Sequence, residues 1–247
     1  MNVNERSKFE RIKNNVNYEN LRKGVENPYL IAVYISSLFE TRSFRNFKIE
    51  LVDNFNIDDH QIEIYLEELE SERILIEEFE KKYLEANGGF LTTKYELIST
   101  YLICRITEPE FAVVTGTAYG GFDTFILIAM MHNNKGNLIS IDLPGKWTDY
   151  DVGYAIPSEL RNRWDYILED TKNSLPDILE INDVDLTIHD SNHEYEHMQW
   201  EFNQFISSMQ EGIIMSHDIL HNSAWFEFVK KYNLENQHVV TTGVALV

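Results

Sequence analysis

The sequence predicts an α/β fold, in which a mainly parallel β-sheet carries helices on both faces and a small helical region precedes it. Three observations predict it. Short apolar runs alternate with helical patterns from residue 111 to the C-terminus. The first run ends in a glycine-rich turn, and an apolar helical stretch continues from there to Met131. A second run, residues 138–141, completes a strand–helix–strand unit. We therefore expect a Rossmann-like domain over residues 105–247 and a separate N-terminal region over residues 1–104.

The N-terminal region has mainly helical patterns. Residues 1 to about 25 are polar and of mixed charge, and we expect them to form a loosely attached helical lead-in. The elements expected after it are helices from Pro28, over 47–54 and from 58 through 69, a strand at 74–76, a turn at 87–89 leading to 90–91, and a linking helix over 92–106. Three helices followed by a hairpin predict a winged-helix-like shape.

The charge of the chain excludes several kinds of partner. The sequence has 41 acidic and 21 basic residues, a formal net charge of −20. Residues 63–80, where a winged helix would contact DNA, contain eight Glu and a single basic residue, Arg73. Such a surface repels polyanions, so we expect neither nucleic acid nor an anionic membrane as a partner. A substrate-covering or dimerising role suits this region better, and a homodimer through it is one expectation.

Length and composition indicate a globular protein. The 247 residues are 43% hydrophobic and 13% aromatic, which argues against disorder. No run of 18 apolar residues is present, and the first residues lack the apolar core of a signal peptide. The single cysteine, Cys104, excludes an internal disulfide and a cysteine-cluster zinc site. We expect a cytoplasmic protein.

The second domain alternates strands and helices in the order of a parallel sheet. Its expected elements are a strand at 111–115, a helix from 121 to 131, a strand at 138–141, a helix at 158–165, a strand at 166–168, a helix at 173–180, a strand at 184–188, a helix at 193–209, a strand at 213–215, a helix at 224–232, and strands at 238–240 and 243–247. Repeated alternation of this kind predicts a sheet covered on both faces.

The first strand–helix turn has the properties of a nucleoside site. Gly116, Gly120 and Gly121 allow the backbone to approach a ligand, and the N-terminus of the following helix suits an anionic group. Asp142 lies 26 residues beyond Gly116, close to where an acid that binds a ribose is expected. The spacing Gly-x-x-x-Gly-Gly departs from the dinucleotide fingerprint, which disfavours a nicotinamide ligand. An ordinary glycine turn beside an empty crevice is the alternative.

Polar side chains follow several of the predicted strands directly. Asp142, Asp190, His217 and Asp218 each come just after an apolar run. In an open α/β sheet, ligands bind at the carboxyl ends of the strands. Apolar strands do not need polar ends of this kind, so we expect these four side chains to form part of a ligand site.

With these residues in place, the chain resembles class I S-adenosylmethionine-dependent methyltransferases. The branch it resembles most is that of small-molecule O-methyltransferases, with the related cephalosporin-hydroxylase and rhamnosyl-methyltransferase-like group. The matching segments, in the family's order, are residues 113–121, 139–142, 164–176, 185–196 and 212–219. The resemblance implies a Rossmann-like fold and methyl transfer to a hydroxyl oxygen of a small molecule, such as a sugar or a secondary metabolite.

The resemblance also implies roles for individual residues. S-adenosylmethionine would be bound by Gly116, Thr117, Ala118, Gly120, Gly121, Asp142, Asp170 and Asp190. In this set Asp142 would accept hydrogen bonds from the ribose hydroxyls, Asp170 would lie near the adenine and Asp190 near the sulfonium. A divalent metal, with Mg²⁺ favoured by oxygen ligands, would be held by Asp190, His217 and Asp218.

Two positions depart from the family pattern. The family usually has an acid just before the Thr-Gly pair of the first turn, which helps to organise the methionine end of the cofactor. Val114 stands there in this chain, so that role falls to another residue or the affinity is lower. The position of His217 is often an acid in metal-binding members. Whether this chain binds a metal, and which one, is therefore left open.

Methyl transfer to a hydroxyl needs the acceptor held in line with the methyl group and its proton removed. His193, three residues after Asp190, is the expected base, and these two are the expected catalytic residues. A structural role for His193 beside the Asp190 loop is the alternative. Asp218 has an alternative too, as the cap of the next helix.

Other residues near this edge have less specific interpretations. His189, His193 and His197 have the spacing of a transition-metal stripe, although a solvated helix face explains them better. Glu196 and Glu201 are expected to be exposed helix charges. Trp147, Tyr150 and Tyr154 suit either an acceptor pocket or a packed loop.

Two functions from different classes follow. The first is the O-methyltransferase. The second is a non-catalytic cofactor-binding or interaction protein of the same fold. In that case, Val114 in place of the usual acid would indicate that the catalytic activity has been lost. Asp142, Asp170, Asp190, His193 and Asp218 together favour the enzyme. A metal hydrolase is disfavoured because it leaves the glycine turn unexplained.

Overall fold

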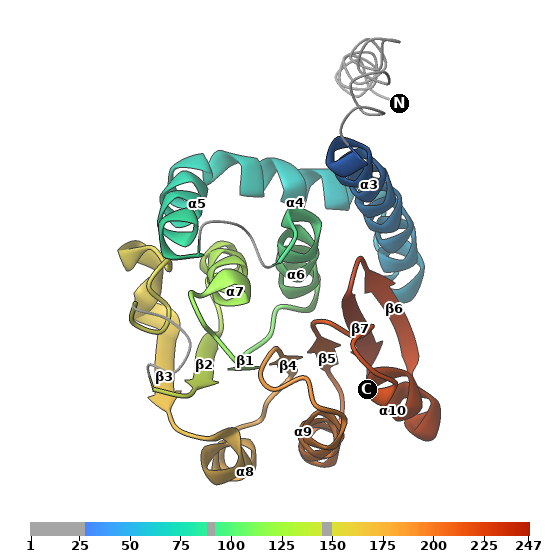
Figure 1. Ribbon diagram of the computed structural model, residues 1–247. Helices are drawn as coiled ribbons and strands as arrows, with labels where there is room; N and C mark the ends of the chain where they lie inside the picture. Colours follow the sequence, from blue (N-terminus) through green and yellow to red (C-terminus); the bar gives the residue numbers. More distant parts are fainter. Residues whose placement is uncertain (1–27, 88–91, 145–149) are drawn as a thin grey trace, which may run out of the picture. The chain divides into compact units, whose positions relative to one another are not determined.

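The computed structural model of the chain describes residues 28–87, 92–144 and 150–247 (Figure 1). The expected polar lead-in, the glycines of the turn at 87–89, the segment 90–91 and Trp147 lie outside these residues. The chain divides into two compact units, Met1–Arg42 and Ser43–Val247. The described part of the first unit is the beginning of helix α3, Pro28–Phe55. The second unit contains the sheet and every candidate site residue.

A seven-stranded sheet forms the centre of the second unit, with the strand order β3-β2-β1-β4-β5-β7-β6. The strands are β1 Phe111–Thr115, β2 Asn137–Asp142, β3 Trp164–Leu168, β4 Leu186–His189, β5 Ile213–Ser216, β6 Glu235–Val239 and β7 Thr242–Leu246. Strands β1 to β5 pair in parallel, whereas β7 pairs antiparallel with both β5 and β6. The expected mainly parallel sheet is therefore confirmed, with a C-terminal antiparallel hairpin added to it.

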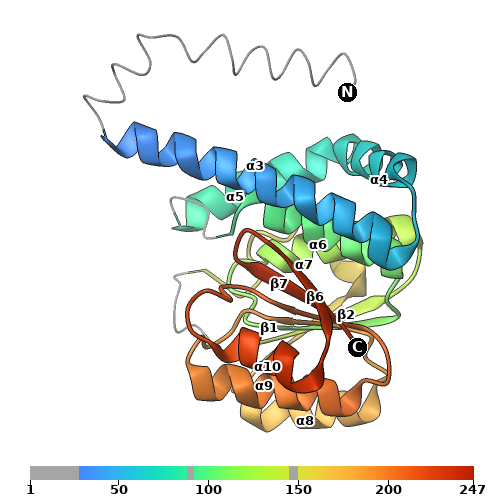
Figure 2. The same ribbon diagram turned by 90° about the vertical axis from the view of Figure 1, so that its right-hand side faces the viewer.

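Helices cover both faces of the sheet, as the alternating pattern predicts. Helices α4 to α7 lie over one face and α8 to α10 over the other (Figure 2). Their bounds are α4 Asp59–Ser71, α5 Arg73–Asn87, α6 Lys94–Thr107, α7 Gly121–Asn133, α8 Thr171–Ile181, α9 Tyr195–Ser208 and α10 Ala224–Tyr232, with a 3₁₀ turn at Ser158–Arg163. No helix among the described residues is long and apolar enough to cross a membrane.

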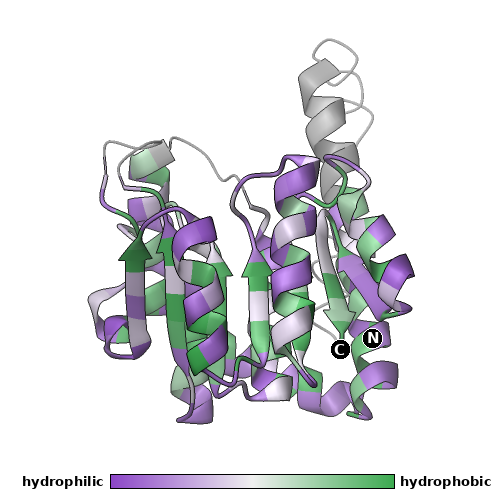
Figure 3. Ribbon diagram, turned by 90° about the horizontal axis from the view of Figure 1, so that it is seen from below, coloured by the Kyte–Doolittle hydropathy of each residue, from purple (hydrophilic) through white to green (hydrophobic). Residues whose placement is uncertain are grey.

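Two apolar cores, one on each face, hold these layers together. Successive side chains of β1 point to opposite faces, so Ala112 and Val114 join the core under α6 and α7, while Val113 joins the core under α8 to α10. The central strands are accordingly mostly hydrophobic along their length (Figure 3). A rigid central sheet of this kind places the polar residues at its strand ends reproducibly.

The N-terminal helices correct two expectations. Helix α3 continues without a break through residues 47–54, where a separate helix was expected. The strand expected at 74–76 is wrong, because these residues belong to helix α5. Phe79 and Tyr83 share the buried face of this helix with Leu75 and Ile76, whereas Ile74 is 81% exposed. Without that strand, no winged-helix hairpin is found among the described residues.

Two helix starts in this region agree with their sequence signals. Asp58 caps α4 by accepting a hydrogen bond from the backbone N–H of Gln61. Thr93 and Glu96 form a reciprocal capping box at the start of α6. Helix α6 packs directly against α7, which begins at the glycine turn. The N-terminal helices of the second unit therefore support the element that forms one wall of the candidate site.

Candidate active site

A cavity of about 280 Å³ lies at the carboxyl ends of β1, β4 and β5, beside the first turn of α7. Its lining residues are Tyr83, Thr92, Gly116, Thr117, Ala118, Gly121, Phe122, Asp123, Asp190, His193, His217 and Asp218. Eight of the predicted site residues are thus brought together: Gly116, Thr117, Ala118, Gly121, Asp190, His193, His217 and Asp218. Three others, Gly120, Asp142 and Asp170, are not among its lining residues.

The glycine turn brings the β1 end and the Asp190 loop into direct contact. Gly116 has a φ of +83°, and a Cβ atom there would collide with the backbone of Asp190 and Ser191. Gly120 has a φ of +90° and precedes the first residue of α7. Both positions require glycine for this backbone shape. The hydroxyl of Thr117 in this turn is buried and has no hydrogen-bond partner, so it is available to a ligand.

Asp142 holds the glycine turn in place. Its Oδ2 accepts hydrogen bonds from the backbone N–H groups of Thr117 at 3.0 Å and Ala118 at 2.7 Å. Its Oδ1 accepts one from Leu143 at 2.6 Å. Burial raises the pKa of Asp142, and these three hydrogen bonds oppose that effect. Each carboxylate oxygen has two lone pairs, so Asp142 retains the capacity to accept further hydrogen bonds.

Asp170 has a structural role at the start of α8. It is the N-cap of α8, where its Oδ1 accepts a hydrogen bond from the backbone N–H of Lys172 at 2.9 Å. The residue is exposed and is the last residue of the loop between β3 and α8. Its expected place near an adenine ring stays a prediction.

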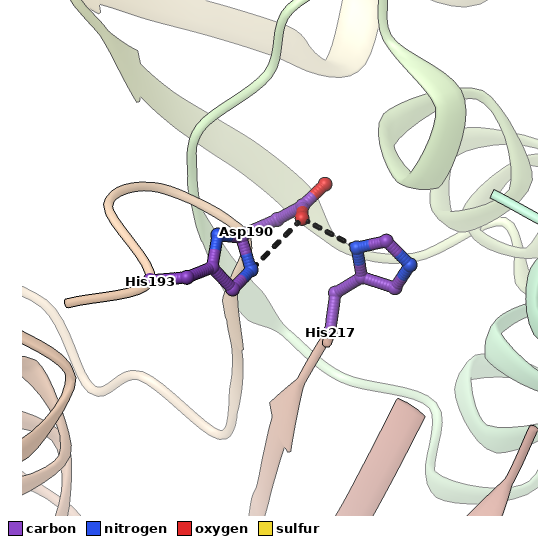
Figure 4. Close-up of side chains that lie close together, drawn as sticks. All are labelled: Asp190, His193 and His217. Carbon is purple, nitrogen blue, oxygen red and sulfur yellow. Dashed lines mark hydrogen bonds and ion pairs between the residues drawn. The ribbon is translucent and has the colours of Figure 1, made fainter. Parts of the chain in front are cut away.

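Asp190 lies between two imidazole rings, as Figure 4 shows. Its Oδ1 is 2.8 Å from Nδ1 of His217, a hydrogen-bonded ion pair, and 3.7 Å from Nε2 of His193. The backbone N–H of Asp190 donates to the carbonyl of Thr115 in β1, which fixes the position of this loop on the sheet. One carboxylate oxygen therefore faces both histidines.

The two histidines have opposite pKa shifts. Burial opposes protonation of His217, but Asp190 and Asp218, together with Glu96, raise the pKa of His217 to about 9. Burial and the neighbouring His189 lower the pKa of His193, and Asp190 opposes that effect. His217 is thus a cation at neutral pH, whereas His193 is held neutral. The buried Nε2 of His193 has no hydrogen-bond partner and keeps a lone pair for a proton.

Asp218 lies at the rim of the cavity. Its side chain is half-exposed, and its Oδ1 is 3.8 Å from Nε2 of His217. The alternative that Asp218 caps the next helix is wrong, because Ser223 is the N-cap residue of α10. Asp218 has a φ of +51°, an uncommon value for a residue with a side chain. Its carboxylate therefore faces His217 and solvent rather than a helix end.

A metal ion would find a mixed set of ligands here. Among the described residues, the group whose ligand atoms all lie within 4.8 Å of one another consists of Asp190, His193 and His217. Two imidazole nitrogens and one carboxylate oxygen suit a transition metal better than Mg²⁺, which prefers oxygen ligands. The donor set thus includes His193 and differs from the expected trio of Asp190, His217 and Asp218.

Sequence reasoning missed a buried network behind Asp190. Glu201, expected to be an exposed charge, is fully buried. Its carboxylate accepts hydrogen bonds from the hydroxyls of Thr115 at 2.6 Å and Ser191 at 2.9 Å, and lies 2.6 Å from Nδ1 of His189 and 2.8 Å from Nε2 of His197. Burial opposes ionisation of Glu201, but His189 and these hydrogen bonds lower its pKa below the ordinary value.

The signal for this burial is present in the helix pattern. Met198, Phe202 and Phe205 form the buried face of α9, and Glu201 lies on that same face by helical spacing. Glu196, in contrast, is exposed as expected. Two histidines of the stripe belong to this network, since His189 and His197 both contact Glu201. The ring centroid of the third, His193, lies 5.2 Å from that of His189. None of the three is exposed, so the expectation of a solvated helix face is wrong.

The two described aromatic residues of the loop after β2 pack against each other with tilted rings. The rings of Tyr150 and Tyr154 have centroids 4.4 Å apart, and Tyr150 also contacts Tyr119 at 6.4 Å. Tyr150 and Tyr154 are not among the residues that line the cavity. The packed-loop interpretation therefore fits their placement.

The central part of the chain is similar to a known protein family. A family model described as a methyltransferase domain matches residues 113–219, from β1 to just beyond β5. This segment contains the glycine turn, Asp142, Asp190, His193 and His217. No curated protein matches the chain significantly.

Solved structures share the fold at low sequence identity. The SAH-bound methyltransferase PaMTH1 of Podospora anserina is 12% identical, with a TM-score of 0.53, and the match covers 70% of this chain and 86% of that chain. An O-methyltransferase from Bacillus cereus in complex with SAH is 11% identical, with a TM-score of 0.51 and coverage of 81% and 96%. A methyltransferase from Geobacter sulfurreducens is 17% identical, with a TM-score of 0.50 and coverage of 70% and 87%.

Proposed function

We propose that this chain is a class I S-adenosylmethionine-dependent methyltransferase and that it transfers the methyl group to a hydroxyl oxygen of a small molecule such as a sugar or a secondary metabolite. One observation carries the proposal. In the cavity beside the glycine turn, His193 is held neutral with an unpartnered Nε2, 3.7 Å from the carboxylate of Asp190. A neutral imidazole backed by a carboxylate is suited to take the proton of a hydroxyl.

The lining of the cavity fits S-adenosylmethionine. The cofactor has a net positive charge, and three carboxyl groups, those of Asp123, Asp190 and Asp218, line the cavity. The unpartnered hydroxyl of Thr117 and the first N–H groups of α7 offer donors to the carboxylate of its methionine part. We assign the binding of the cofactor to the predicted set: Gly116, Thr117, Ala118, Gly120, Gly121, Asp142, Asp170 and Asp190.

When bound, S-adenosylmethionine supplies an electrophilic methyl group on a sulfonium. The chain's own part is to orient the acceptor and remove its proton. Nε2 of His193 accepts the hydroxyl proton, and Asp190 stabilises the imidazolium that forms. His217 keeps Asp190 in position through the 2.8 Å ion pair. Much of the rate then comes from alignment of the acceptor oxygen, which the rigid strand ends provide.

A divalent metal is the second way to ionise the hydroxyl, and Asp190, His217 and Asp218 are its proposed ligands. Such an ion would lower the pKa of a bound hydroxyl. It would have to replace the hydrogen bond between Asp190 and His217. The side chain of His193 lies close enough to complete the set.

The remaining expectations about the whole protein stay proposals. We propose a homodimer formed through the N-terminal region and a cytoplasmic location. The division between residues 104 and 105 marks where we place the start of the methyltransferase domain proper. The acceptor is expected to be a small molecule rather than a nucleic acid, because the net charge of the chain is −20.

Calorimetric titration with S-adenosylmethionine and with S-adenosylhomocysteine tests the proposal, in magnesium and in chelator. We expect micromolar binding of both ligands and a loss of at least tenfold in Asp142→Ala. A screen of hydroxylated acceptors, with release of S-adenosylhomocysteine as readout, follows. Absence of binding would contradict cofactor use. Binding without turnover of any acceptor would favour the non-catalytic alternative.

A further inference from the structure

Asp123 is a buried carboxyl group that the proposed reaction does not yet use. It lies in the first turn of α7 and is 1% exposed. The hydroxyl of Ser140 in β2 donates a hydrogen bond to its Oδ1, and the indole N–H of Trp164 donates in turn to Ser140 at 2.9 Å. Asp123 also lines the cavity together with Gly116 and Thr117. The carboxyl group is therefore buried in the protein but adjacent to the ligand space.

No positive side chain compensates this carboxyl group. Among the described residues, no ion pair includes Asp123, and the charged groups that shift its pKa are two other acids, Asp142 and Asp190. Burial raises the pKa of Asp123 to about 7. A buried carboxylate is costly unless it meets a partner of opposite charge. This wall of the cavity is thus built to receive a cation or a strong hydrogen-bond donor.

The same turn of α7 also offers donors for an anion. The first N–H groups of a helix have no acceptor within the helix, and the helix dipole favours negative charge there. The buried, unpartnered hydroxyl of Thr117 lies at the same end. A carboxylate-binding end and a cation-binding carboxyl group within one helical turn match an α-amino acid, which carries both charges on one carbon atom.

We propose that the carboxyl group of Asp123 binds the α-ammonium group of the methionine part of the cofactor, while the N-terminus of α7 and Thr117 bind the α-carboxylate. This inference rests on the proposed use of S-adenosylmethionine and assigns one contact within it. Asp123 would then serve the charge-recognition role left open by Val114, which is fully buried in the apolar core.

A purely structural role for Asp123 makes a different prediction. If the carboxyl group only ties α7 to β2 through Ser140, its loss weakens every ligand of the cavity to the same degree. If it binds the ammonium group, its loss weakens only ligands that carry this group. The comparison of two ligands that differ in a single amino group therefore separates the two roles.

The experiment is calorimetric titration of the full chain with S-adenosylhomocysteine and with its analogue that lacks the α-amino group. We expect the wild type to bind S-adenosylhomocysteine about 10- to 100-fold more tightly than the desamino analogue. Asp123→Asn should lose about that factor for S-adenosylhomocysteine and change the affinity for the analogue by less than about threefold. Asp165→Asn, which alters an exposed acid of β3, is the matched control and should leave both affinities unchanged.

Each outcome has a distinct meaning. Failure of the wild type to bind S-adenosylhomocysteine contradicts the proposed function itself. Equal affinity of the wild type for both ligands overturns the role of Asp123 and leaves cofactor binding intact, as does an equal loss for both ligands in Asp123→Asn. If thermal melting shows that Asp123→Asn is not folded, Asp123→Ser serves as the second variant. The preference of the wild type for S-adenosylhomocysteine over the desamino analogue needs no variant.

Discussion

A single carboxylate oxygen organises the candidate site at the scale of residues. Oδ1 of Asp190 pairs with His217 and faces His193, so two chemically identical rings acquire opposite protonation states. His217, enclosed by acids, is a cation, whereas burial keeps His193 neutral. His217 therefore holds Asp190 in place through the ion pair, whereas His193 is able to accept a proton.

Replacement of the proton acceptor should remove catalysis and spare binding. We expect His193→Asn to lower the rate of methyl transfer by about 10²- to 10⁴-fold, because general-base catalysis contributes on that order. The affinity for S-adenosylhomocysteine should change by less than about threefold, since His193 takes a proton and carries no cofactor charge. Steady-state kinetics with an acceptor from the screen and calorimetry measure the two effects.

The pH profile gives an independent check on His193. Its pKa lies below the ordinary 6.5, so the wild-type rate should stay level near neutral pH and fall only as the pH drops below about 6.5. His238→Asn, which alters an exposed histidine of β6, should behave as the wild type. A variant at position 193 that retains full activity would overturn the assignment of the base.

The anchor histidine should make stability depend on alkaline pH. The pKa of His217 is about 9 in the folded chain against an ordinary 6.5, so its contribution is fully present below pH 6.5 and is lost as the pH rises through 9. The shift corresponds to about 3 kcal/mol. We expect urea denaturation in chelator to show wild type more stable than His217→Asn by about this amount at pH 6, with the difference closing by pH 10. A difference that is constant with pH would contradict the ion pair.

At the scale of elements, the loop between β4 and α9 is held from behind by a helix residue. Glu201 reaches from α9 to Thr115 at the end of β1, to Ser191 in the loop and to His189 at the end of β4. These residues flank Asp190 on the sheet side. The position of the candidate active-site loop therefore depends on a fully buried carboxylate whose lone pairs are all directed at donors.

Loss of this buried carboxylate should destabilise the fold strongly. We expect Glu201→Gln to lower the free energy of unfolding by about 3–5 kcal/mol, because it leaves buried donors and a buried imidazole without their partner. For a chain of this size, the melting temperature should fall by roughly 10 °C. Glu196→Gln on the exposed face of the same helix should change stability by less than about 0.5 kcal/mol. Equal effects of the two substitutions would show that the network carries little energy.

Helices and strands were predicted correctly where residues close together in the sequence determine the structure. The start of α4 at Asp58 and the apolar strands of the sheet each depend on a few neighbouring residues, and the structure has them as expected. The segment 74–76 failed because three consecutive apolar residues satisfy a strand pattern and a helix pattern alike. Only the packing of Phe79 and Tyr83 against the core decides in favour of α5.

The candidate site was predictable only in part, for a similar reason. Parallel strands end at a common edge, so sequence alone could place Asp190, His217 and Asp218 together. The burial of Asp123 and Glu201 depends on which helix face meets the sheet, and a single acid does not reveal that. Both acids lie among apolar residues of their helices. Assigning each residue to a face of its helix would have placed them on the buried side.

At the scale of the whole molecule, the net charge of −20 and the acidic lining of the cavity act in the same direction. S-adenosylmethionine carries a net charge of +1, whereas its product S-adenosylhomocysteine is neutral overall. The field of the protein should therefore favour the substrate form of the cofactor and release of the product. Because this preference is partly long-range, salt should weaken it.

Salt dependence of the two affinities tests this idea with a ligand pair that serves as its own control. Raising NaCl from about 0.05 to about 0.5 M should weaken S-adenosylmethionine binding by roughly 3- to 10-fold, since the screening length falls well below the dimensions of the domain. The affinity for S-adenosylhomocysteine should change by less than about twofold over the same range, because its two charges are close together and are held by short-range contacts. Calorimetric titration at four salt concentrations measures both slopes. Parallel slopes would mean that discrimination between substrate and product is local to Asp190, and the surplus of acids on the rest of the chain would then have no part in cofactor exchange.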